Sequence, residues 1–384
     1  MDIKTCKGRF WLLSFFITLL FLATHNLGLM TSSSYAADEK GEWAKVVSAA
    51  KKEGKVVIYG PPGRNRRKAL VNAFEKDYPD IKVKYLAGSG RKQSPRLLAE
   101  RKAGKFTADI HIGGTTTIVK VLKPAGALDP IRPYLILSEV TDPSRWFKKK
   151  LWFSDLEEKY NFMFQGSVSN LIAYNTKLVG SNEITSYKDL LKPKWKGKII
   201  SADVRRPGPG GGQSRFIYAS KDLGPEYLKK LFSETKITLS LDRRQIVDWL
   251  AQGKFAINVF ASSIHVERAL DQGLPIRIVA PENLKEGAPM SAGWGTVVVL
   301  NRAPHPNTAK VYLNWLLSRK GQMAWQRFAG AASLRTDISR EGVRSWNLPK
   351  EGKDYFFVSL EKYANIETRK IRKIIGKAVE GRGK

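Results

Sequence analysis

Short apolar runs alternate along much of the chain with segments whose apolar residues recur every three or four positions. The first run, Val56-Val57-Ile58-Tyr59, stops at Gly60-Pro61-Pro62-Gly63, a sequence that neither a strand nor a helix continues through. The apolar residues of segment 69–74 then fall at helical spacing. This pattern predicts a strand, a glycine-rich turn and a helix.

The same order occurs twice more. Ile81, Val83 and Tyr85 alternate like a strand that ends at Gly88-Ser89-Gly90, and a helix is predicted to start around residues 97–101. The next strand, residues 109–112, ends at Gly113-Gly114. Strands that alternate with helices in this way predict βαβ units on a parallel sheet.

An irregular stretch rich in Pro, Trp and Lys, residues 131–164, interrupts this pattern. Further strands are predicted at residues 171–174, 198–200, 255–259, 276–279 and 296–300, and further helices at residues 245–251, 265–272, 308–317 and 322–328. We therefore expect an α/β protein, and we find no internal repeat.

The N-terminus has the three parts of a secretory signal. A short basic segment precedes the apolar run Phe10–Ala23, and a polar stretch ends at the small-residue exit Ala36-Ala37. The alternative is an uncleaved membrane anchor, but the apolar run is shorter than the roughly 20 residues of a spanning helix. We therefore expect residues 1–37 to be a cleaved signal peptide, with cleavage near Ala36/Ala37 and a soluble product in the periplasm.

The charge balance points to an anionic partner. The 384 residues include 66 Lys+Arg and 35 Asp+Glu, so the formal net charge is +31. Such an excess favours a small anion, an acidic surface or nucleic acid, without choosing among them. Cys6 is the one cysteine, which excludes a disulfide scaffold and a site with several cysteine ligands.

Patterns of catalytic and metal-binding residues are missing from the sequence. His111, His265 and His305 each lack a second histidine three or four residues away, so the helix-borne metal pattern is absent. The chain also lacks the Gly-x-Ser-x-Gly elbow and the Gly-x-x-x-x-Gly-Lys-Ser/Thr loop. We therefore expect a binding protein, not an enzyme, with no metal site and no cofactor.

Glycine turns with polar or basic neighbours recur where strands should end. The four turns are Gly60–Arg64, Gly88–Arg91, Gly113–Thr116 and Gly210–Arg215. Strand ends of an open parallel sheet face the ligand crevice, and helix starts there offer unpaired N–H groups to an anion. Arginine adds a two-pronged donor for carboxylate, phosphate or sulfonate. The alternative is that these glycines only make turns.

Later segments resemble the type II periplasmic solute-binding proteins of ABC importers, in particular the iron(III)-binding-like branch. The resemblance rests on Asn170–Asn175, on Tyr187–Ile199 with its Trp195-Lys196-Gly197-Lys198, and on Ser318–Gln322. It covers roughly residues 45 to 340 and implies two α/β lobes, each a mixed, mostly parallel sheet flanked by helices, joined by strand crossovers. The lobes implied are residues 38–133 plus 281–330 for lobe 1 and 134–280 for lobe 2, with 331–384 as a C-terminal extension that packs on lobe 2.

The resemblance also implies that one solute is held between the lobes by the glycine turns. The candidate ligand-binding residues are Arg64, Ser89, Gly90, Arg91, Thr115, Thr116 and Trp294 on the first lobe and Arg205, Arg206, Gln213, Ser214, Arg215 and Ser262 on the second. Arg91 and Arg205 are the arginines that we expect to pair with the solute's charge.

One difference from the family bears on the solute. Ferric-binding members carry two adjacent tyrosines after the strand that corresponds to Phe255–Val259, whereas this chain has Phe260-Ala261-Ser262-Ser263-Ile264. Serines and arginines suit an oxyanion such as a phosphate ester, phosphonate, sulfonate or carboxylate. We therefore expect a monomeric receptor that delivers a small anionic solute to an inner-membrane ABC permease and has no nucleic-acid partner. The alternatives are an iron(III) or other metal-ion receptor of the same fold, and an exported enzyme or polyanion-binding protein.

The basic C-terminal tail allows two interpretations. Ile371, Ile374, Ile375 and Ala378 fall on one helical face, and lysines and arginines surround them. Such a helix could bind an anionic membrane surface or partner. We favour the other interpretation, a terminal helix that packs on the body of the protein with its charges in water.

Overall fold

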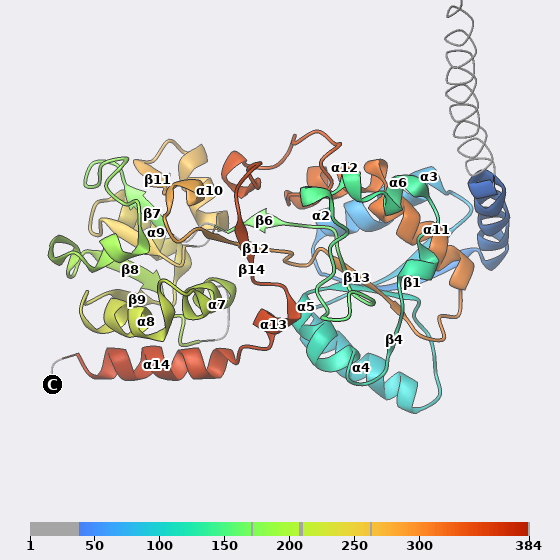
Figure 1. Cartoon of the computed structure of the whole chain (residues 1–384), viewed down its shortest axis with the longest axis horizontal. Coiled ribbons are helices and arrows are strands. Elements are labelled where there is room, and N and C mark those ends of the chain that lie inside the picture. Colours follow the sequence, from blue (N-terminus) through green and yellow to red (C-terminus); the bar gives the residue numbers. More distant parts are fainter. Residues whose placement is uncertain (1–37, 170–171, 207–209, 262, 383–384) are drawn as a thin grey trace, which may run out of the picture.

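The computed structural model describes residues 38–169, 172–206, 210–261 and 263–382. The expected signal peptide, residues 1–37, and the candidate ligand residue Ser262 lie outside the described residues. The described chain begins with a helix over residues 38–53, at the outer end of the first lobe (Figure 1). Within the described part of the chain, no helix is long and apolar enough to cross a membrane.

The first lobe is built on a six-stranded sheet with the order β2-β1-β3-β13-β4, in which β5 also pairs with β13. The strands are β1 (Lys55–Gly60), β2 (Lys82–Ala87), β3 (Ile110–Gly113), β4 (Leu128–Asp129), β5 (Phe162–Met163) and β13 (Thr296–Leu300). β1 pairs in parallel with β2 and β3, whereas β13 is antiparallel to β3. The three predicted parallel strands are confirmed.

Helices cover both faces of this sheet. They are α2 (Arg64–Arg67), η1 (Lys68–Asn72), α3 (Ala73–Asp77), α4 (Gly90–Lys102), α5 (Thr115–Thr117), η2 (Ile118–Leu122), α11 (Pro306–Leu317) and α12 (Arg319–Ala329). Alternate residues of β1 point to opposite faces, so Ile58 packs with Leu70 of η1 and Val57 packs with Leu97 of α4. Both faces are buried, which is why the strands read as nearly continuous apolar runs.

The second lobe is built on a five-stranded sheet with the order β11-β7-β10-β8-β9. Its strands are β7 (Ile172–Asn175), β8 (Ile199–Ala202), β9 (Thr238–Ser240), β10 (Ile257–Val259) and β11 (Ile276–Ile278). Its helices are α7 (Gly211–Ala219), α8 (Gly224–Ser233), α9 (Arg243–Ala251) and α10 (Ser263–Asp271). β8, β9 and β10 are parallel, and β7 is antiparallel to its neighbours β10 and β11.

A three-stranded sheet lies between the two larger sheets (Figure 1). Its strands are β6 (Ser167–Val168), β12 (Ala288–Ser291) and β14 (Tyr355–Phe357). The chain leaves the first lobe after β5, passes through β6 to reach β7, and returns through β12 to β13. We call this three-stranded sheet the hinge sheet because the crossings between the lobes run through its strands.

Short helical turns fill the connections. In the first lobe they are η3 (Arg132–Tyr134), α6 (Ser138–Thr141), η4 (Pro143–Arg145) and η5 (Phe147–Lys149). Later in the chain they are η6 (Tyr187–Leu191), η7 (Pro193–Trp195), η8 (Pro281–Asn283) and η9 (Ser345–Asn347).

The first crossing lies further along the chain than residue 134, where the sequence placed the start of lobe 2. β5 pairs with β13 of the six-stranded sheet, and Trp146, Phe153 and Phe162 share a core with Ile58 of β1. Residues 134–163 therefore pack with the first lobe, because their aromatic side chains fill its core. The sequence showed only an irregular stretch here.

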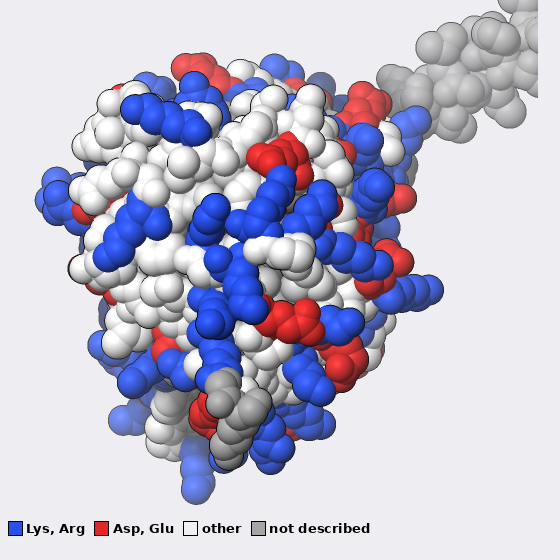
Figure 2. All heavy atoms as spheres, turned by 90° about the vertical axis from the view of Figure 1, so that its left-hand side faces the viewer, with Lys and Arg blue, Asp and Glu red and all other residues white. Residues whose placement is uncertain are grey.

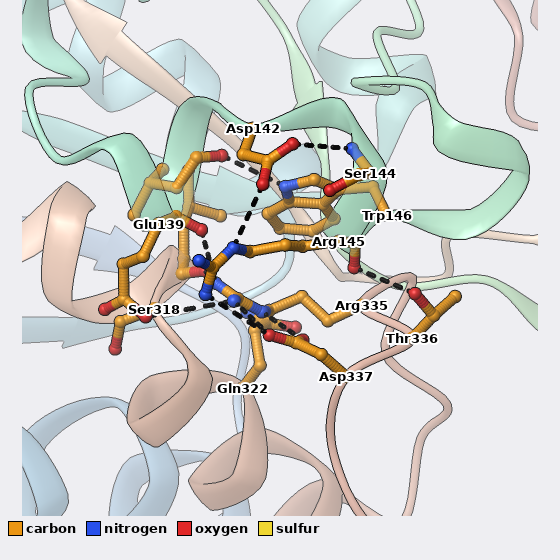
Figure 3. A network of polar contacts seen from close by, with 12 residues as sticks. Glu139, Asp142, Ser144, Arg145, Trp146, Ser318, Gln322, Arg335, Thr336 and Asp337 are labelled. Carbon is orange, nitrogen blue, oxygen red and sulfur yellow. Dashed lines mark hydrogen bonds and ion pairs between the residues drawn. The ribbon is translucent and has the colours of Figure 1, made fainter. Parts of the chain in front are cut away.

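The C-terminal extension, residues 331–382 of the described chain, begins on the first lobe. Arg335 is fully buried, and its guanidinium donates to both carboxylate oxygens of Asp337 at 2.8 and 2.7 Å and to the Leu317 carbonyl at 2.9 Å. Arg145 lies on the same carboxylate, 3.8 Å from an oxygen of Asp337 (Figure 3). This network fixes the start of the extension against the end of α11 and against η4.

The extension then crosses the hinge sheet and ends on the second lobe. β14 pairs in parallel with β12, and α13 (Glu361–Ala364) contacts α5 of the first lobe. α14 (Thr368–Glu380) packs against α8 and α7, with Ile371, Ile375 and Ala378 buried. The predicted apolar face of α14 thus packs against the second lobe. Because α13 contacts the first lobe, the extension contacts both lobes.

Candidate functional site

The carboxyl ends of β1, β2 and β3 lie at the edge where a parallel sheet exposes its ligand crevice. We call the turns and helix starts at this edge the first-lobe wall. The side chains of Tyr85 and Gln93 tie the first two turns together: the Tyr85 hydroxyl donates to the Pro61 carbonyl at 2.7 Å, and Gln93 Nε2 donates to the Gly60 carbonyl at 3.1 Å. A Cβ at Gly60 would lie 2.4 Å from the Tyr85 ring, so only glycine fits there. The turn after β1 is therefore rigidly placed.

Arg66 of α2 is the cation of this wall. Its guanidinium carbon lies 4.4 Å from the centre of the Trp294 ring, and Nη1 donates to the Pro62 carbonyl at 3.2 Å. Burial lowers the pKa of Arg66, and Tyr85 partly opposes this shift. Among the residues that the structure describes, no carboxylate forms an ion pair with it. A half-buried guanidinium without a counter-charge favours the binding of an anion.

Thr115 is the first residue of α5, shortly after β3. Its neighbour Gly114 approaches the same indole, because a Cβ at Gly114 would lie 3.6 Å from Trp294 Cδ1. The Thr115 side chain is buried, at 5% exposure, and within the described part of the chain its Oγ1 has no hydrogen-bond partner. A buried hydroxyl without a partner is costly, so this atom is a second candidate contact for a polar solute.

The N-terminus of α4 completes the wall. A Cβ at Gly90, the first residue of α4, would lie 2.3 Å from Thr117 Oγ1, so the helix start abuts α5. Ser89 precedes it and makes no side-chain capping bond. The first N–H groups of a helix of this length and its dipole favour an anion.

The turn that carries Trp294 is held by residues from both sides of the hinge sheet. The Ala292 N–H donates to Ser359 Oγ of the C-terminal extension at 2.9 Å, and the Gly293 N–H donates to Ser291 Oγ at 3.0 Å. A Cβ at Gly295 would lie 2.2 Å from Cβ of Gln165 on the first crossing. The position of Trp294 therefore depends on the hinge and on the extension.

The structure brings together some of the first-lobe residues expected from the sequence. Gly90 abuts Thr117 of α5, and Gly114, which precedes Thr115, approaches Trp294, with Ser89 at the start of α4. Arg64, Arg91 and Thr116 belong to the same turns and are exposed. The sequence reasoning missed Arg66. The signal that could have found it is the helical spacing after Gly63, which turns Arg66 inward and leaves Arg64 and Arg67 in solvent.

Two second-lobe arginines face the C-terminal extension. Arg205 donates to both carboxylate oxygens of Asp203, at 2.8 and 2.9 Å, and this bond raises its pKa, with Glu380 of α14 adding to the effect. Arg215 is half-buried beside Arg372 of α14. Arg206 is exposed. The charge of Arg205, which we expected to pair with the solute, is thus already compensated within the protein.

The ends of β8 and β10 meet the start of α7 on the second lobe. A Cβ at Gly210 would lie 3.0 Å from Val204 Cγ1 and 3.8 Å from Phe260 Cβ. Phe260 has a φ of 53°, a left-handed conformation that is uncommon for a bulky residue. Of the expected residues, Ser214 is buried with its hydroxyl donating to the Gly211 carbonyl at 3.1 Å, and Gln213 is half-buried.

The described residues contain no group of three or more His, Cys, Asp and Glu side chains that could hold a metal ion. The donors gathered on the first-lobe wall are a guanidinium, a hydroxyl and main-chain N–H groups. Such a set can bind an oxyanion, whereas a hard cation needs oxygen ligands that carry negative charge.

The chain matches known proteins over most of its length. A model of the family "Bacterial extracellular solute-binding protein" matches residues 60–323. A Salmonella typhimurium protein described as a candidate 2-aminoethylphosphonate-binding periplasmic protein is 24% identical over 211 residues, which are 48% of this chain and 59% of that protein. This chain thus matches under two thirds of that relative. An uncharacterized Haemophilus influenzae protein is 23% identical over 85% of this chain and 90% of its own.

Solved structures share the two-lobed fold. The Trichodesmium FutA structure with iron and citrate has a TM-score of 0.64 at 20% identity and covers 85% of this chain and 99% of its own. AfuA from Actinobacillus pleuropneumoniae, with fructose-6-phosphate bound, has a TM-score of 0.56 at 20% identity and covers 85% of this chain and 98% of its own. The expected fold class is confirmed.

Proposed function

The chain belongs to the family of bacterial extracellular solute-binding proteins, and on that premise we propose that it captures a small anionic solute and delivers it to an ABC permease. The solute class is an oxyanion: a phosphate ester, phosphonate, sulfonate or carboxylate. The proposal includes export to the periplasm with cleavage near Ala36/Ala37, and action as a monomer.

One observation carries the choice of an anion. Arg66 is half-buried on the face of Trp294 and has no carboxylate partner among the described residues. The same edge of the first-lobe sheet carries the buried Thr115 hydroxyl after β3 and the N-terminus of α4 after β2. An oxyanion would supply the missing charge to Arg66 and accept bonds from the other two groups, which is the arrangement that binds such groups in proteins.

The names of two similar proteins support the same class. The name of the Salmonella relative gives 2-aminoethylphosphonate as its ligand, and the AfuA structure contains fructose-6-phosphate. Both ligands carry a phosphorus oxyanion.

Capture would proceed by closure of the lobes about the hinge sheet. A solute favours the closed form only through contacts that the open form lacks. Trp294 stands at the point where β12 returns to the first lobe, so a change at the hinge moves the face on which Arg66 rests. We therefore expect the contacts of Arg66 and Trp294 to change when the lobes close.

A thermal-unfolding screen of the purified protein tests the proposal. The panel contains phosphate esters, phosphonates, sulfonates, carboxylates and ferric salts. A tight solute at about 100 times its Kd adds about 2.7 kcal/mol to the stability of the folded state. We expect this from an oxyanion of the panel.

The same screen can overturn the proposal. Stabilisation by ferric salts alone, with a visible charge-transfer band, would make the protein an iron(III) receptor. Turnover of a phosphate ester would make it an enzyme. A panel without any stabilising oxyanion would also contradict the proposal.

A further inference from the structure

The outer end of the second lobe carries a surplus of positive charge. Figure 2 shows Lys and Arg side chains spread over this face, with fewer Asp and Glu. Part of the charge lies on α14, which runs along the lower edge of the lobe and packs against α8 (Figure 1). Residues 367–382 contain six Lys and Arg residues and two Glu residues. The packing of the apolar face of α14 on the second lobe leaves these basic residues without an assigned role.

The lysines of α14 form a stripe outside its packed face. Lys370, Lys373 and Lys377 follow one another at spacings of three and four residues, so they lie along one side of the helix. All three are exposed. Lys370 lies 4.0 Å from Glu367, whereas Lys373 and Lys377 form no ion pair within the described part of the chain. The stripe is therefore open to an external partner with negative charge.

A groove of about 400 Å³ runs beside this stripe, between α8 and α14. Its apolar lining includes Ile374 and Ala378 of α14 and Pro225 of α8. Ile374 is half-exposed, although the isoleucines on either side of it along the packed face are buried. Lys377 lines the groove from α14 and Lys229 lines it from α8. The α8–α14 groove thus combines an apolar lining with a cation on each helix.

Nearby acidic residues do not cancel this charge. Glu226 lines the same groove and lies 3.8 Å from Lys229, and the side chains of both residues are mostly exposed to solvent. Such an exposed pair is weak and is easily replaced by another anion. Glu380, near the end of α14, acts on Arg205 of the second lobe. The groove and the stripe therefore keep a net positive charge.

We propose that the α8–α14 groove and the lysine stripe dock the protein on the surface of an anionic phospholipid bilayer. Headgroup phosphates would pair with Lys229, Lys373 and Lys377, and the acyl region below them would contact Ile374. Apolar side chains flanked by lysines are typical of protein surfaces that lie at the headgroup boundary. Docking of this kind does not require a solute, and it would hold the protein beside any permease in the same membrane.

The size of the groove favours a lipid over a partner helix. A helix with its side chains is about 10 Å across, and two turns of it fill more space than the groove offers. An acyl chain is much thinner. The stripe also continues beyond the groove through Lys370 and Lys373, where a layer of headgroups would reach it.

Co-sedimentation with vesicles tests this proposal. The protein is expressed with its own N-terminus and purified from the periplasmic fraction, and the vesicles contain phosphatidylcholine with or without phosphatidylglycerol. We expect binding only when phosphatidylglycerol is present, and weaker binding at high salt because salt screens exposed charges. The double variant Lys229→Gln, Lys377→Gln should bind at least about tenfold more weakly, since each cation near an anionic surface contributes about fivefold.

Matched variants separate this site from general effects of charge and hydrophobicity. Lys68→Gln, Lys76→Gln removes the same charge from exposed positions of the first lobe and should leave binding nearly unchanged. Ile374→Ala keeps the charge and should weaken binding several-fold through the lost apolar contact. Met323→Ala, at an exposed apolar residue of α12, should have no effect. Thermal unfolding without vesicles verifies that each variant is folded.

Three results would overturn this proposal. The first is equal binding to vesicles with and without phosphatidylglycerol. The second is an equal loss of binding in the two double lysine variants, which would show that only net charge matters. The third is binding of poly-L-glutamate as tight as that of the vesicles and independent of Ile374, which would assign the face to an acidic protein partner. None of these outcomes depends on whether the solute site exists.

Discussion

Arg66 and Arg335 show how the surroundings of an arginine decide its role. Arg335 is fully buried, yet Asp337 and the Leu317 carbonyl satisfy its guanidinium, so it holds the fold together. Arg66 is less buried, but among the described residues its hydrogen-bond acceptor is a single carbonyl, that of Pro62. The incomplete set of partners makes Arg66, and not Arg335, a candidate for contact with a solute.

A substitution of Thr115 tests whether its unpartnered hydroxyl binds the solute. Thr115→Val keeps the shape and removes the hydroxyl, which costs about 1 kcal/mol of binding if the solute accepts its hydrogen bond, or roughly fivefold in Kd. Stability without solute should stay equal or rise, because a buried unpaired polar atom is lost. Titration calorimetry and urea unfolding measure the two quantities. Thr116→Val, at an exposed position, is the control. Unchanged affinity in Thr115→Val would remove the hydroxyl from the site.

The burial of His111 predicts that the protein loses stability at low pH. It is fully buried in β3, burial lowers its pKa to about 4, and neither ring nitrogen has a partner among the described residues. The unfolded chain therefore binds a proton at this residue below about pH 6.5, whereas the folded chain does so only near pH 4. The stability from the neutral ring is present above pH 6.5 and is lost as the pH falls towards 4.

Urea unfolding of wild type and His111→Leu at pH 7.5 and pH 4 measures this loss. The loss amounts to on the order of 3 kcal/mol, since each pKa unit is worth about 1.4 kcal/mol. The variant should lose less stability than wild type over this range, by about that amount. Equal losses would show that His111 does not titrate differently in the two states.

At the residue scale the sequence predicted the positions of turns better than the partners of charged side chains. The turns that contain Gly90, Thr115 and Trp294 lie at one end of the first-lobe sheet, as expected, because glycine turns and strand ends are local features of sequence. The charge balance of Arg205 was not predicted, because its ion pair with Asp203 depends on the local turn conformation and its neighbour Glu380 is recognisable only once α14 has been placed. Arg66 was missed because the choice between Arg64 and Arg66 depends on the orientation of one helical turn.

At the scale of elements, the C-terminal extension is the unusual part. It begins in the Arg335 network, adds β14 to the hinge sheet, touches the first lobe through α13 and ends with α14 on the second lobe. Glu361 anchors its middle, because its carboxylate accepts bonds from Lys123 at 2.7 Å and from the Leu156 N–H at 2.9 Å. Any movement of the lobes must therefore be accommodated by this segment.

The docking of α14 is tested by two isoleucines on one helix. Ile375 is fully buried against α8, and Ile374 is half-exposed. Ile375→Ala should lower the free energy of unfolding by about 2–5 kcal/mol, as for buried aliphatic residues generally, and Ile374→Ala by much less. Urea unfolding measures both. Equal, small effects would mean that α14 does not pack on the body in solution.

The long, strongly patterned elements followed from the sequence, and the short ones did not. β1 and β3 are apolar runs closed by glycine turns, β2 alternates up to such a turn, β13 is a run of β-branched residues, and the helical face of α14 is periodic. β14 is only three residues long, Tyr355–Phe357, and exists because β12 offers an edge to pair with. Such a strand has no local signal, since its partner is far away in the sequence.

At the scale of the whole molecule, the family resemblance identified the architecture correctly. The family match and the solved structures confirm a two-lobed solute-binding protein. The division of the chain between the lobes was harder to predict. Residues 134–163 pack with the first lobe through Trp146 and Phe162, and the extension contacts both lobes. Packing partners of aromatic residues in irregular segments decide these boundaries, and the sequence does not reveal them.

We expect the affinity for the solute to depend most on the ion pair between its charge and Arg66. Titration calorimetry of the oxyanion found in the screen, with wild type, Arg66→Gln and the exposed control Lys68→Gln, measures the contribution of this ion pair. Removal of one partner from a desolvated charge pair costs about 2–5 kcal/mol, so Arg66→Gln should weaken binding by at least about thirtyfold. Lys68→Gln should bind like wild type. Equal affinity of Arg66→Gln and wild type would contradict the account.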